Sequence, residues 1–355
     1  MHKRFSRVTG FGLLAAVATV TAAAADDYKW WPWTVEDWST GSKRMVDFVP
    51  PEKAVKRWHI CAILPHMKDS WWVAIDYGLV AEAERLGVKL TVFEAGGYGN
   101  LVRQVAQYDD CLAIGADAII VSAISQAGVT KKVQEGKSKG VVQIALANPI
   151  PDAPVDAHVL NDPEMGGYIG GTQALKYLKT IKEPKVVVMP GPAGAGFAEA
   201  AAAGFAKAVQ SSNVKILDVK YGDLGKSEQL RLVEDALQTY DHIDMIFGAA
   251  VTAEVAGGAI EDAGRGGEVK VATWYSSAAI LDGIKNGDVY AATVEWPVAM
   301  AQVAVDLAVQ KLEKSGGQYG EVRPVLEALT VENIGSVDLR RAFAPEGFQP
   351  IFSVE

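Results

Sequence analysis

Short apolar segments alternate with segments of helical period along most of the chain. Residues 58–65 (WHICAILP) and 89–95 (KLTVFEA) are short and apolar, which is typical of buried strands. Between them, residues 71–88 (WWVAIDYGLVAEAERLGV) place apolar side chains at helical spacing, and Gly87 marks the end of the predicted helix. Repetition of this pattern to about residue 148 predicts βαβ units around a parallel sheet.

The same alternation restarts near residue 162 and continues to about residue 315. It therefore predicts an α/β fold of two doubly wound parallel-sheet lobes joined by a hinge. We expect the first lobe to comprise residues 56–161 plus 297–325. The second lobe is expected to comprise residues 162–296 plus 326–355, which include the tail of the chain. Residues 1–25 and 26–55 precede the lobes as separate segments.

The predicted ends of the strands are rich in aromatic and acidic residues. In open α/β sheets, ligands lie beyond the carboxyl ends of the strands, so two facing lobes form a cleft at those ends. The residues that we expect there are Asp69, Trp71, Trp72, Tyr98, Asp162, Thr252, Trp274, Tyr275, Glu295 and Trp296.

Aromatic rings on this rim indicate the kind of ligand. They belong to Trp71, Trp72, Trp274, Tyr275 and Trp296. Aromatic faces stack on sugar rings and attract cations, and a cation–π contact is worth about 0.5–2 kcal/mol. A carboxylate at Asp69, Asp162 or Glu295 favours a positive or hydrogen-bond-donating ligand. The competing interpretation is that Trp72 and Trp274 fill the interiors of the lobes, since buried aromatics dominate cores.

Signatures of catalysis or of a cofactor are missing from the sequence. The loop 191–196 (GPAGAG) lacks both G-x-G-x-x-G and the G-K-[ST] ending of a P-loop, so we interpret it as a strand-to-helix turn. There is no G-x-S-x-G, the histidines show no triad spacing, and no C-x-x-C suggests a metal site. The sequence predicts a binding protein without cofactor or metal, not an enzyme.

The first 25 residues have the three-part layout of a secretory signal peptide. A basic segment precedes the apolar run 11–20 (FGLLAAVATV), and small residues end at Ala25, where we expect cleavage. The alternative is a membrane anchor, but ten apolar residues are too short to span about 30 Å. Cleavage changes the formal net charge from −9 to −12, which argues against nucleic acid as a partner. We therefore expect export to the periplasm.

Residues 26–55 hold four tryptophans among acids and prolines. These are Trp30, Trp31, Trp33 and Trp38. We interpret the segment as an irregular arm whose indoles pack on the body of the protein, because aromatic side chains bury large areas. The alternative is a tag that binds a partner.

Cys61 and Cys111 are the only cysteines of the chain. Cys61 lies in the first predicted strand and Cys111 at the end of the second predicted helix, which are neighbours in a βαβ unit. In an oxidising compartment the pair indicates a disulfide. Two buried free thiols are the alternative.

Several segments of the chain resemble a known family when they are taken together in order. They are CAILPHMKDSWW, GVKLTVFEAGGY, QYDDCLAIGADAIIVS, VVVMPGPAGAGFAEAAAAGF and APEGFQPIF. The chain from Trp58 to the C-terminus resembles the type I periplasmic binding proteins of the ribose-binding kind. Its nearest resemblance is to members that detect trimethylamine N-oxide and signal to a membrane sensor histidine kinase.

The resemblance implies a ligand cage and no chemistry on the ligand. By position, the family's cage falls on Asp69, Trp71, Trp72 and Tyr275, where aromatic faces would attract the methylated nitrogen of trimethylamine N-oxide. Both cysteines fall within matching segments, which favours the disulfide.

The chain departs from the family pattern at the crossing segment 160–167 (LNDPEMGG). Asp162 stands where the family has an aromatic residue, which would suit a full cation or a hydroxylated ligand. The arginine of the ribose-binding proteins is also missing after the 191–196 loop, where Glu199 lies. Two functions therefore remain: a sensor that docks on a histidine kinase, or the solute receptor of an ABC importer for a sugar or amine, which would dock on its permease. A LacI-type repressor would need an N-terminal helix-turn-helix in place of the signal peptide.

Overall fold

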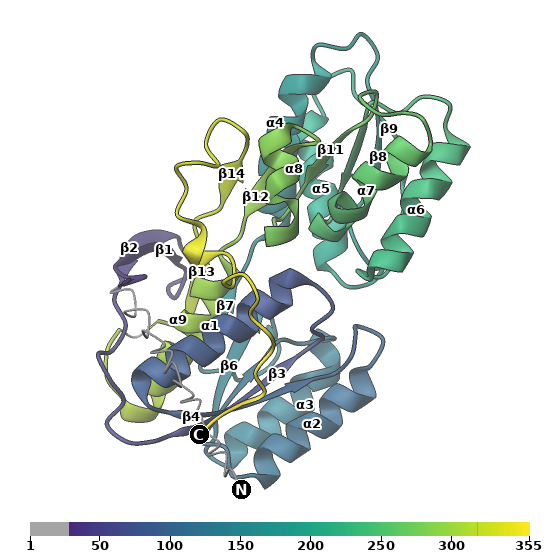
Figure 1. Cartoon of the computed structure of the whole chain (residues 1–355). Helices are drawn as coiled ribbons and strands as arrows, with labels where there is room; N and C mark the ends of the chain where they lie inside the picture. Colours follow the sequence, from purple (N-terminus) through teal and green to yellow (C-terminus); the bar gives the residue numbers. More distant parts are fainter. Residues whose placement is uncertain (1–27, 318) are drawn as a thin grey trace, which may run out of the picture.

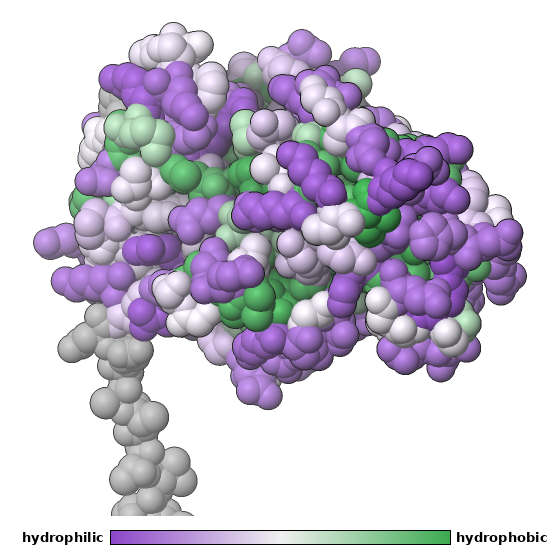
Figure 2. Space-filling model, turned by 90° about the horizontal axis from the view of Figure 1, so that it is seen from above, coloured by the Kyte–Doolittle hydropathy of each residue, from purple (hydrophilic) through white to green (hydrophobic). Residues whose placement is uncertain are grey.

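Two α/β lobes make up the computed structural model of the chain, which describes residues 28–317 and 319–355 (Figure 1). The predicted signal peptide, residues 1–25, lies outside the described residues. Within the described part of the chain, no helix is long and apolar enough to cross a membrane. Seen from above the second lobe, polar side chains cover most of the surface and apolar ones gather in narrow gaps between them (Figure 2).

The first lobe is built on a nine-stranded sheet with the order β15-β4-β3-β5-β6-β7-β13-β1-β2. Its parallel strands are β3 (His59–Leu64), β4 (Lys89–Glu94), β5 (Ala118–Val121), β6 (Val142–Ala147), β7 (Ala157–Leu160) and β13 (Glu321–Pro324). The helices are α1 (Ser70–Leu86), α2 (Leu101–Ala113), α3 (Gln126–Ser138) and α9 (Pro297–Glu313).

Helices cover both faces of this sheet, as a doubly wound fold requires. Ile60, Ala62 and Leu64 of β3 belong to the core under α1 and α9, whereas Cys61 and Ile63 belong to the core that includes residues of α2 and α3. Successive side chains of a strand point to opposite faces, so one apolar run serves two cores. This explains why the strand is apolar throughout.

The second lobe has a six-stranded sheet with the order β14-β12-β11-β10-β8-β9. The strands are β8 (Lys185–Met189), β9 (Lys215–Val219), β10 (Met245–Gly248), β11 (Lys270–Thr273), β12 (Val289–Val294) and β14 (Glu327–Leu329). The helices are α4 (Pro163–Leu178), α5 (Phe197–Val209), α6 (Lys226–Thr239), α7 (Ala250–Asp262) and α8 (Leu281–Asn286), with the 3₁₀ turn η1 (Ala278–Ile280) before α8. Only β14 runs antiparallel among these strands. The predicted fold class is confirmed.

The chain passes between the two sheets four times. Three crossings lie between β7 and α4, between β12 and α9, and between β13 and β14, and a fourth, after β14, carries the tail back to the first sheet. We propose the domain boundaries of the lobes at the first three crossings, which correspond to residues 161/162, 296/297 and 325/326. These three crossings lie beside the cleft, so strand-end residues of both lobes face one another there.

The N-terminal arm is not irregular, and this expectation is wrong. Residues Trp33–Asp37 (β1) and Arg44–Phe48 (β2) form an antiparallel hairpin that extends the first sheet beyond β13. The indoles do pack on the body: Trp30 and Trp33 are buried, and Trp30 Nε1 donates to Glu82 Oε2 at 3.1 Å. The hairpin forms because the open edge of β13 offers unpaired backbone groups.

The tail returns to the first lobe after β14, so only the start of residues 326–355 lies in the second lobe, where the whole segment was expected. After β14 and the 3₁₀ turn η2 (Leu339–Arg341), β15 (Ser353–Val354) pairs antiparallel with β4. The backbone N–H of Ile351 donates to the buried carboxylate of Asp76 at 2.8 Å, and the rings of Tyr77 and Phe348 lie 5.1 Å apart. These contacts give a buried carboxylate on α1 a donor and cover the edge of β4.

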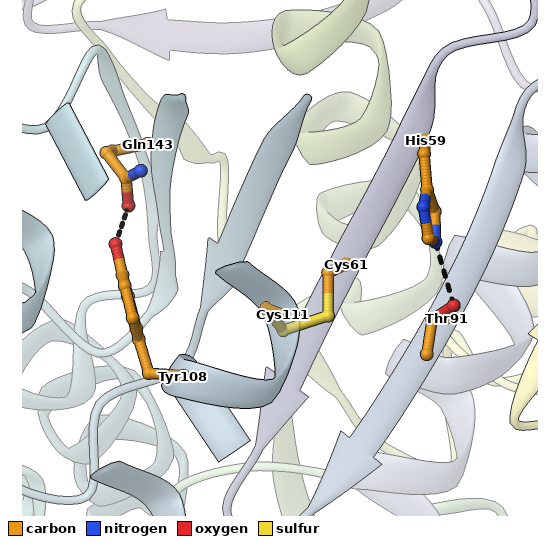
Figure 3. The surroundings of a disulfide bond; sticks show 6 residues. All are labelled: His59, Cys61, Thr91, Tyr108, Cys111 and Gln143. Carbon is orange, nitrogen blue, oxygen red and sulfur yellow. Dashed lines mark hydrogen bonds between the residues drawn. A yellow bond between two sulfur atoms is a disulfide. The ribbon is translucent and has the colours of Figure 1, made fainter. Parts of the chain in front are cut away.

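Cys61 and Cys111 form a disulfide that joins β3 to α2 (Figure 3). Their Cα atoms lie 5.8 Å apart and neither residue is exposed. The disulfide expectation is confirmed, and the alternative of two free thiols is wrong. The hydroxyl of Tyr108, also on α2, meets the side chain of Gln143 on β6, which fastens the same helix at a second point (Figure 3).

Candidate ligand-binding site

A cavity lies between the lobes at the carboxyl ends of the strands. It encloses about 360 Å³ of empty space, including the part open to solvent. Its lining comes from both lobes and from two of the crossings. The lining residues are Asp69, Trp71, Trp72, Tyr98, Ala147, Asn148, Asn161, Phe197, Leu224, Trp274, Tyr275 and Glu295.

Asp69 places the two adjacent tryptophans at this cavity. Its carboxylate caps α1 by accepting a hydrogen bond from the backbone N–H of Trp72 at 2.9 Å. An N-cap fixes where a helix begins, so Trp71 and Trp72 occupy the first turn, beside the cleft. Their rings meet edge to face with centroids 4.9 Å apart. Both indoles are buried, yet both line the cavity.

Aromatic rings of the second lobe face this pair. Trp274 and Tyr275 follow β11 with ring centroids 4.5 Å apart, and Trp274 Nε1 donates to the carbonyl of Pro190 at 3.1 Å. Phe197, at the start of α5, lies 5.9 Å from the Trp274 ring and 5.3 Å from the Tyr98 ring of the first lobe. The rings thus form an aromatic box with walls from both lobes.

Two buried carboxyl groups, those of Asp69 and Glu295, complete the box. Burial raises the pKa of Asp69 to about 7 and the pKa of Glu295 to about 8. Hydrogen bonds oppose these shifts, among them the one that Glu295 Oε1 accepts from Asn161 Nδ2 at 3.3 Å. No lysine or arginine lines the cavity among the described residues. A cation would therefore meet two acidic groups with no competing charge.

Three fully buried side-chain atoms of the box have no hydrogen-bond partner in the described protein. They are Trp71 Nε1, Tyr275 Oη and Glu295 Oε2. The Trp71 indole N–H is near enough to Glu295 to lower its pKa, but it lies outside hydrogen-bond geometry. Leaving such a group buried and unpaired costs about 1–3 kcal/mol. A ligand that supplies one acceptor and one donor would recover part of this cost.

Asp162 does not line the aromatic box, although the sequence placed it there. Its carboxylate caps α4 by accepting from the Met165 N–H at 2.9 Å, and it lies 3.7 Å from Arg323 Nη1. The preceding residue, Asn161, lines the box in its place. Because Asp162 is used as a helix cap, its side chain is turned to the start of α4.

Trp296 and Thr252 also lie outside the box, contrary to expectation. Trp296 is buried, and its Nε1 donates to the carbonyl of Val325 at 2.8 Å, so it fastens two crossings together. Thr252 Oγ1 donates to Gln229 Oε1 at 2.7 Å inside the second lobe. The other rim expectations, Asp69, Trp71, Trp72, Tyr98, Trp274, Tyr275 and Glu295, do meet at one cavity.

Several box residues carry no sequence signal beyond their position. Asn148 follows β6, Leu224 follows β9, and Phe197 begins α5, so the same strand-end rule would have found them. Behind the box, the ring of His66 packs against Trp72 at 5.9 Å and Tyr98 at 5.6 Å. Burial lowers the pKa of His66 to about 4, so it is a neutral wall at physiological pH.

The 191–196 loop is a strand-to-helix turn, as expected. The Glu199 carboxylate accepts from the backbone N–H groups of Gly194 at 2.6 Å and Gly196 at 2.9 Å. A phosphate cradle would need such N–H groups free. The acid therefore occupies the position that an anion would take.

The family is now evident from fold, cleft and comparison together. The family model described as a periplasmic binding protein domain matches residues 60–317, and the chain belongs to this family of ligand-binding proteins. The periplasmic protein TorT of Escherichia coli K12 is 32% identical over 317 residues, which cover 89% of this chain and 90% of TorT. The ribose import binding protein RbsB of Haemophilus influenzae is 22% identical over 181 residues, 51% of this chain and 61% of RbsB.

Solved structures of two kinds of binding protein are similar to this chain. An ABC transporter solute binding protein from Bradyrhizobium sp. BTAi1, with bound bis-tris, is 39% identical with a TM-score of 0.80, covering 92% of this chain and 100% of that one. A complex of the TorS sensor domain with TorT in the presence of trimethylamine N-oxide (TMAO) matches at 28% identity and a TM-score of 0.75, covering 83% and 99%.

Proposed function

We propose that this chain is an exported periplasmic protein that binds trimethylamine N-oxide or a related alkylated amine and signals to a membrane sensor histidine kinase. The observation that carries the ligand class is the aromatic box, closed by rings of both lobes and containing two buried acids. The similarity to TorT over nine-tenths of both chains supports the partner. The signal peptide would direct export and would be cleaved after Ala25.

The chemistry of the box suits an alkylated nitrogen. Methyl or methylene groups on a positive or positively polarised nitrogen pack against the faces of Trp71, Trp72 and Trp274 with cation–π attraction. The oxygen of an N-oxide needs a donor, which Tyr275 Oη and Trp71 Nε1 can supply. A sugar would need a larger set of polar groups for its hydroxyls than the box offers.

The second candidate is the solute receptor of an ABC importer. The Bradyrhizobium solute binding protein at 39% identity favours it, and bis-tris is itself a tertiary amine with hydroxyl groups. Both functions use the same cleft and differ in the partner that reads it. A sensor-kinase gene beside the gene for this chain would favour the sensor, and a permease gene would favour the importer. Co-purification with the periplasmic segment of the kinase or of the permease would distinguish the two functions directly.

A thermal-shift titration of the mature chain tests the proposal. We would compare trimethylamine N-oxide, methylated amines and a panel of sugars. A ligand at 100 times its dissociation constant stabilises a protein by about 2.7 kcal/mol, which is easily measured. Stabilisation by amines or the N-oxide is expected. Stabilisation by sugars alone would overturn the ligand class and favour sugar import.

A further inference from the structure

A second cavity adjoins the aromatic box and differs from it in chemistry. It holds about 1,270 Å³ of empty space, including the part open to solvent, and we call it the polar chamber. Four residues line both spaces: Ala147, Asn148, Asn161 and Phe197. The two spaces therefore share this wall. A ligand arm that passes these residues would reach from the box into the chamber.

The two asparagines at this junction offer acceptors. Asn148 Nδ2 donates to the carbonyl of Ala123 at 2.8 Å, and because a carbonyl only accepts, this contact fixes the orientation of the amide. Asn161 Nδ2 donates to Glu295 at 3.3 Å. No donor within residues 28–317 and 319–355 reaches the Oδ1 atom of either residue. A ligand hydroxyl at the junction could donate to these oxygens.

Charges in the polar chamber disfavour an acidic ligand. Arg323 is its one basic lining residue among those described, and its guanidinium pairs with Glu321 at 2.6 Å and lies 3.7 Å from Asp162. The chamber also holds Glu164. With the arginine neutralised, the remaining polar lining groups are acidic or neutral. Phe197 is the sole aromatic lining residue of the described chamber, so the alkylated nitrogen belongs in the box.

We propose that the ligand is a hydroxylated alkylamine: its nitrogen occupies the aromatic box, and a hydroxyl-bearing arm passes Asn148 and Asn161 into the polar chamber. This rests on the proposed function, since the box must first bind the amine. It goes further, because trimethylamine N-oxide would fill the box alone and leave the junction acceptors unpaired.

Isothermal titration calorimetry with matched cations tests this proposal. Tetramethylammonium is the head alone, choline adds a hydroxyethyl arm, and n-propyltrimethylammonium has an arm of equal length without the hydroxyl. We expect choline to bind about fivefold tighter than the propyl analogue, since one neutral hydrogen bond changes affinity by about two- to tenfold. Glycine betaine, whose arm is a carboxylate, should bind more weakly than choline.

The Asn161→Ala variant tests whether Asn161 accepts the hydrogen bond from the choline hydroxyl. Its choline-to-propyl affinity ratio should fall to within about twofold of unity, whereas loss of the Glu295 contact affects both cations and cancels in the ratio. The wild-type ratio needs no variant, so it decides the question even if Asn161→Ala does not fold.

Three results would overturn the proposal. Equal affinities for choline and the propyl analogue would mean that the hydroxyl makes no favourable contact. The amine site in the box would then still stand. Betaine binding tighter than choline would mean an acidic arm. Binding of none of these cations, nor of trimethylamine N-oxide, would overturn both this proposal and the proposed function.

Discussion

The carboxyl groups of Asp69 and Glu295 set the charge of the aromatic box, because both are buried and no basic side chain lines the box in the described chain. With pKa values raised by burial to about 7 and about 8, both are largely protonated in the empty box at pH 6. A cation favours the ionised form, so its binding and proton release are linked.

The affinity for tetramethylammonium should therefore rise with pH. Between pH 6 and 8 we expect an increase of up to about tenfold per pH unit, levelling above the pKa of Glu295, with proton release visible as a dependence of the calorimetric heat on the buffer. The Asp69→Asn variant keeps an N-cap residue for α1 but removes one acid, so it should flatten the profile without losing stability. A pH-independent affinity in the wild type would contradict this linkage.

Glu295 should also make the ligand-free protein less stable as pH rises. Its folded pKa of about 8 exceeds the ordinary glutamate pKa of 4.5, so the folded state holds an extra proton between these values. That contribution is complete below pH 4.5 and is lost as pH rises through about 8. Relative to wild type, Glu295→Gln should gain a few kcal/mol of unfolding free energy from pH 5 to 8, measured by urea titration. If the unfolding free energies of the wild type and of Glu295→Gln change in parallel with pH, the pKa of Glu295 is not raised in the folded state.

Trp72 can be separated from an ordinary core tryptophan by a matched pair of variants. Trp72 and Trp30 are each 3% exposed, but only Trp72 lines the box. Either change to alanine should cost about 3–5 kcal/mol of stability. Only Trp72→Ala should lower ligand affinity, by tenfold or more in calorimetry. Wild-type affinity in the folded Trp72→Ala protein would return this residue to the core interpretation.

At the scale of elements, the disulfide acts on stability and not on the site. Cys61 belongs to the core that includes α2, on the face of β3 opposite α1, and the bond closes a loop with a sequence separation of 50 residues. Replacing both cysteines by alanine should cost about 2–4 kcal/mol in urea unfolding. Ligand affinity should stay within about twofold, because α1 and its tryptophans keep their packing. A large loss of affinity would mean that β3 had shifted.

The sequence predicts the elements better than their partners. The alternation after Trp58 gives strands and helices, and strand-end position gives most of the box. In β1, the burial of Trp33, Val35 and Asp37 follows the period of two that a strand produces, but its partner β13 lies almost 290 residues away. Asp162 and Asn161 are adjacent, and only the cap at α4 decides which one enters the box.

At the scale of the whole molecule, a ring pair and an ion pair join the lobes across the cleft, in addition to the contacts at the crossings. The Tyr98 and Phe197 rings lie 5.3 Å apart, and Lys68 Nζ lies 3.3 Å from Asp223 Oδ2. The ion-pair side chains are 41% and 44% exposed, and such pairs contribute about 0–1 kcal/mol. The ring pair lines the box, so a ligand there packs against residues of both lobes and would help to hold them together.

Closure should consequently depend on the ring pair far more than on the ion pair. Phe197→Ala is expected to weaken amine binding tenfold or more, because it removes a wall of the box and a contact between lobes. Lys68→Ala should change affinity by less than about threefold, and that change should vanish at 0.5 M salt, where charges are screened within about 4 Å. Calorimetry at low and high salt measures both. A larger, salt-resistant loss in Lys68→Ala would mean that the ion pair, and not the aromatic box, holds the lobes together around the ligand.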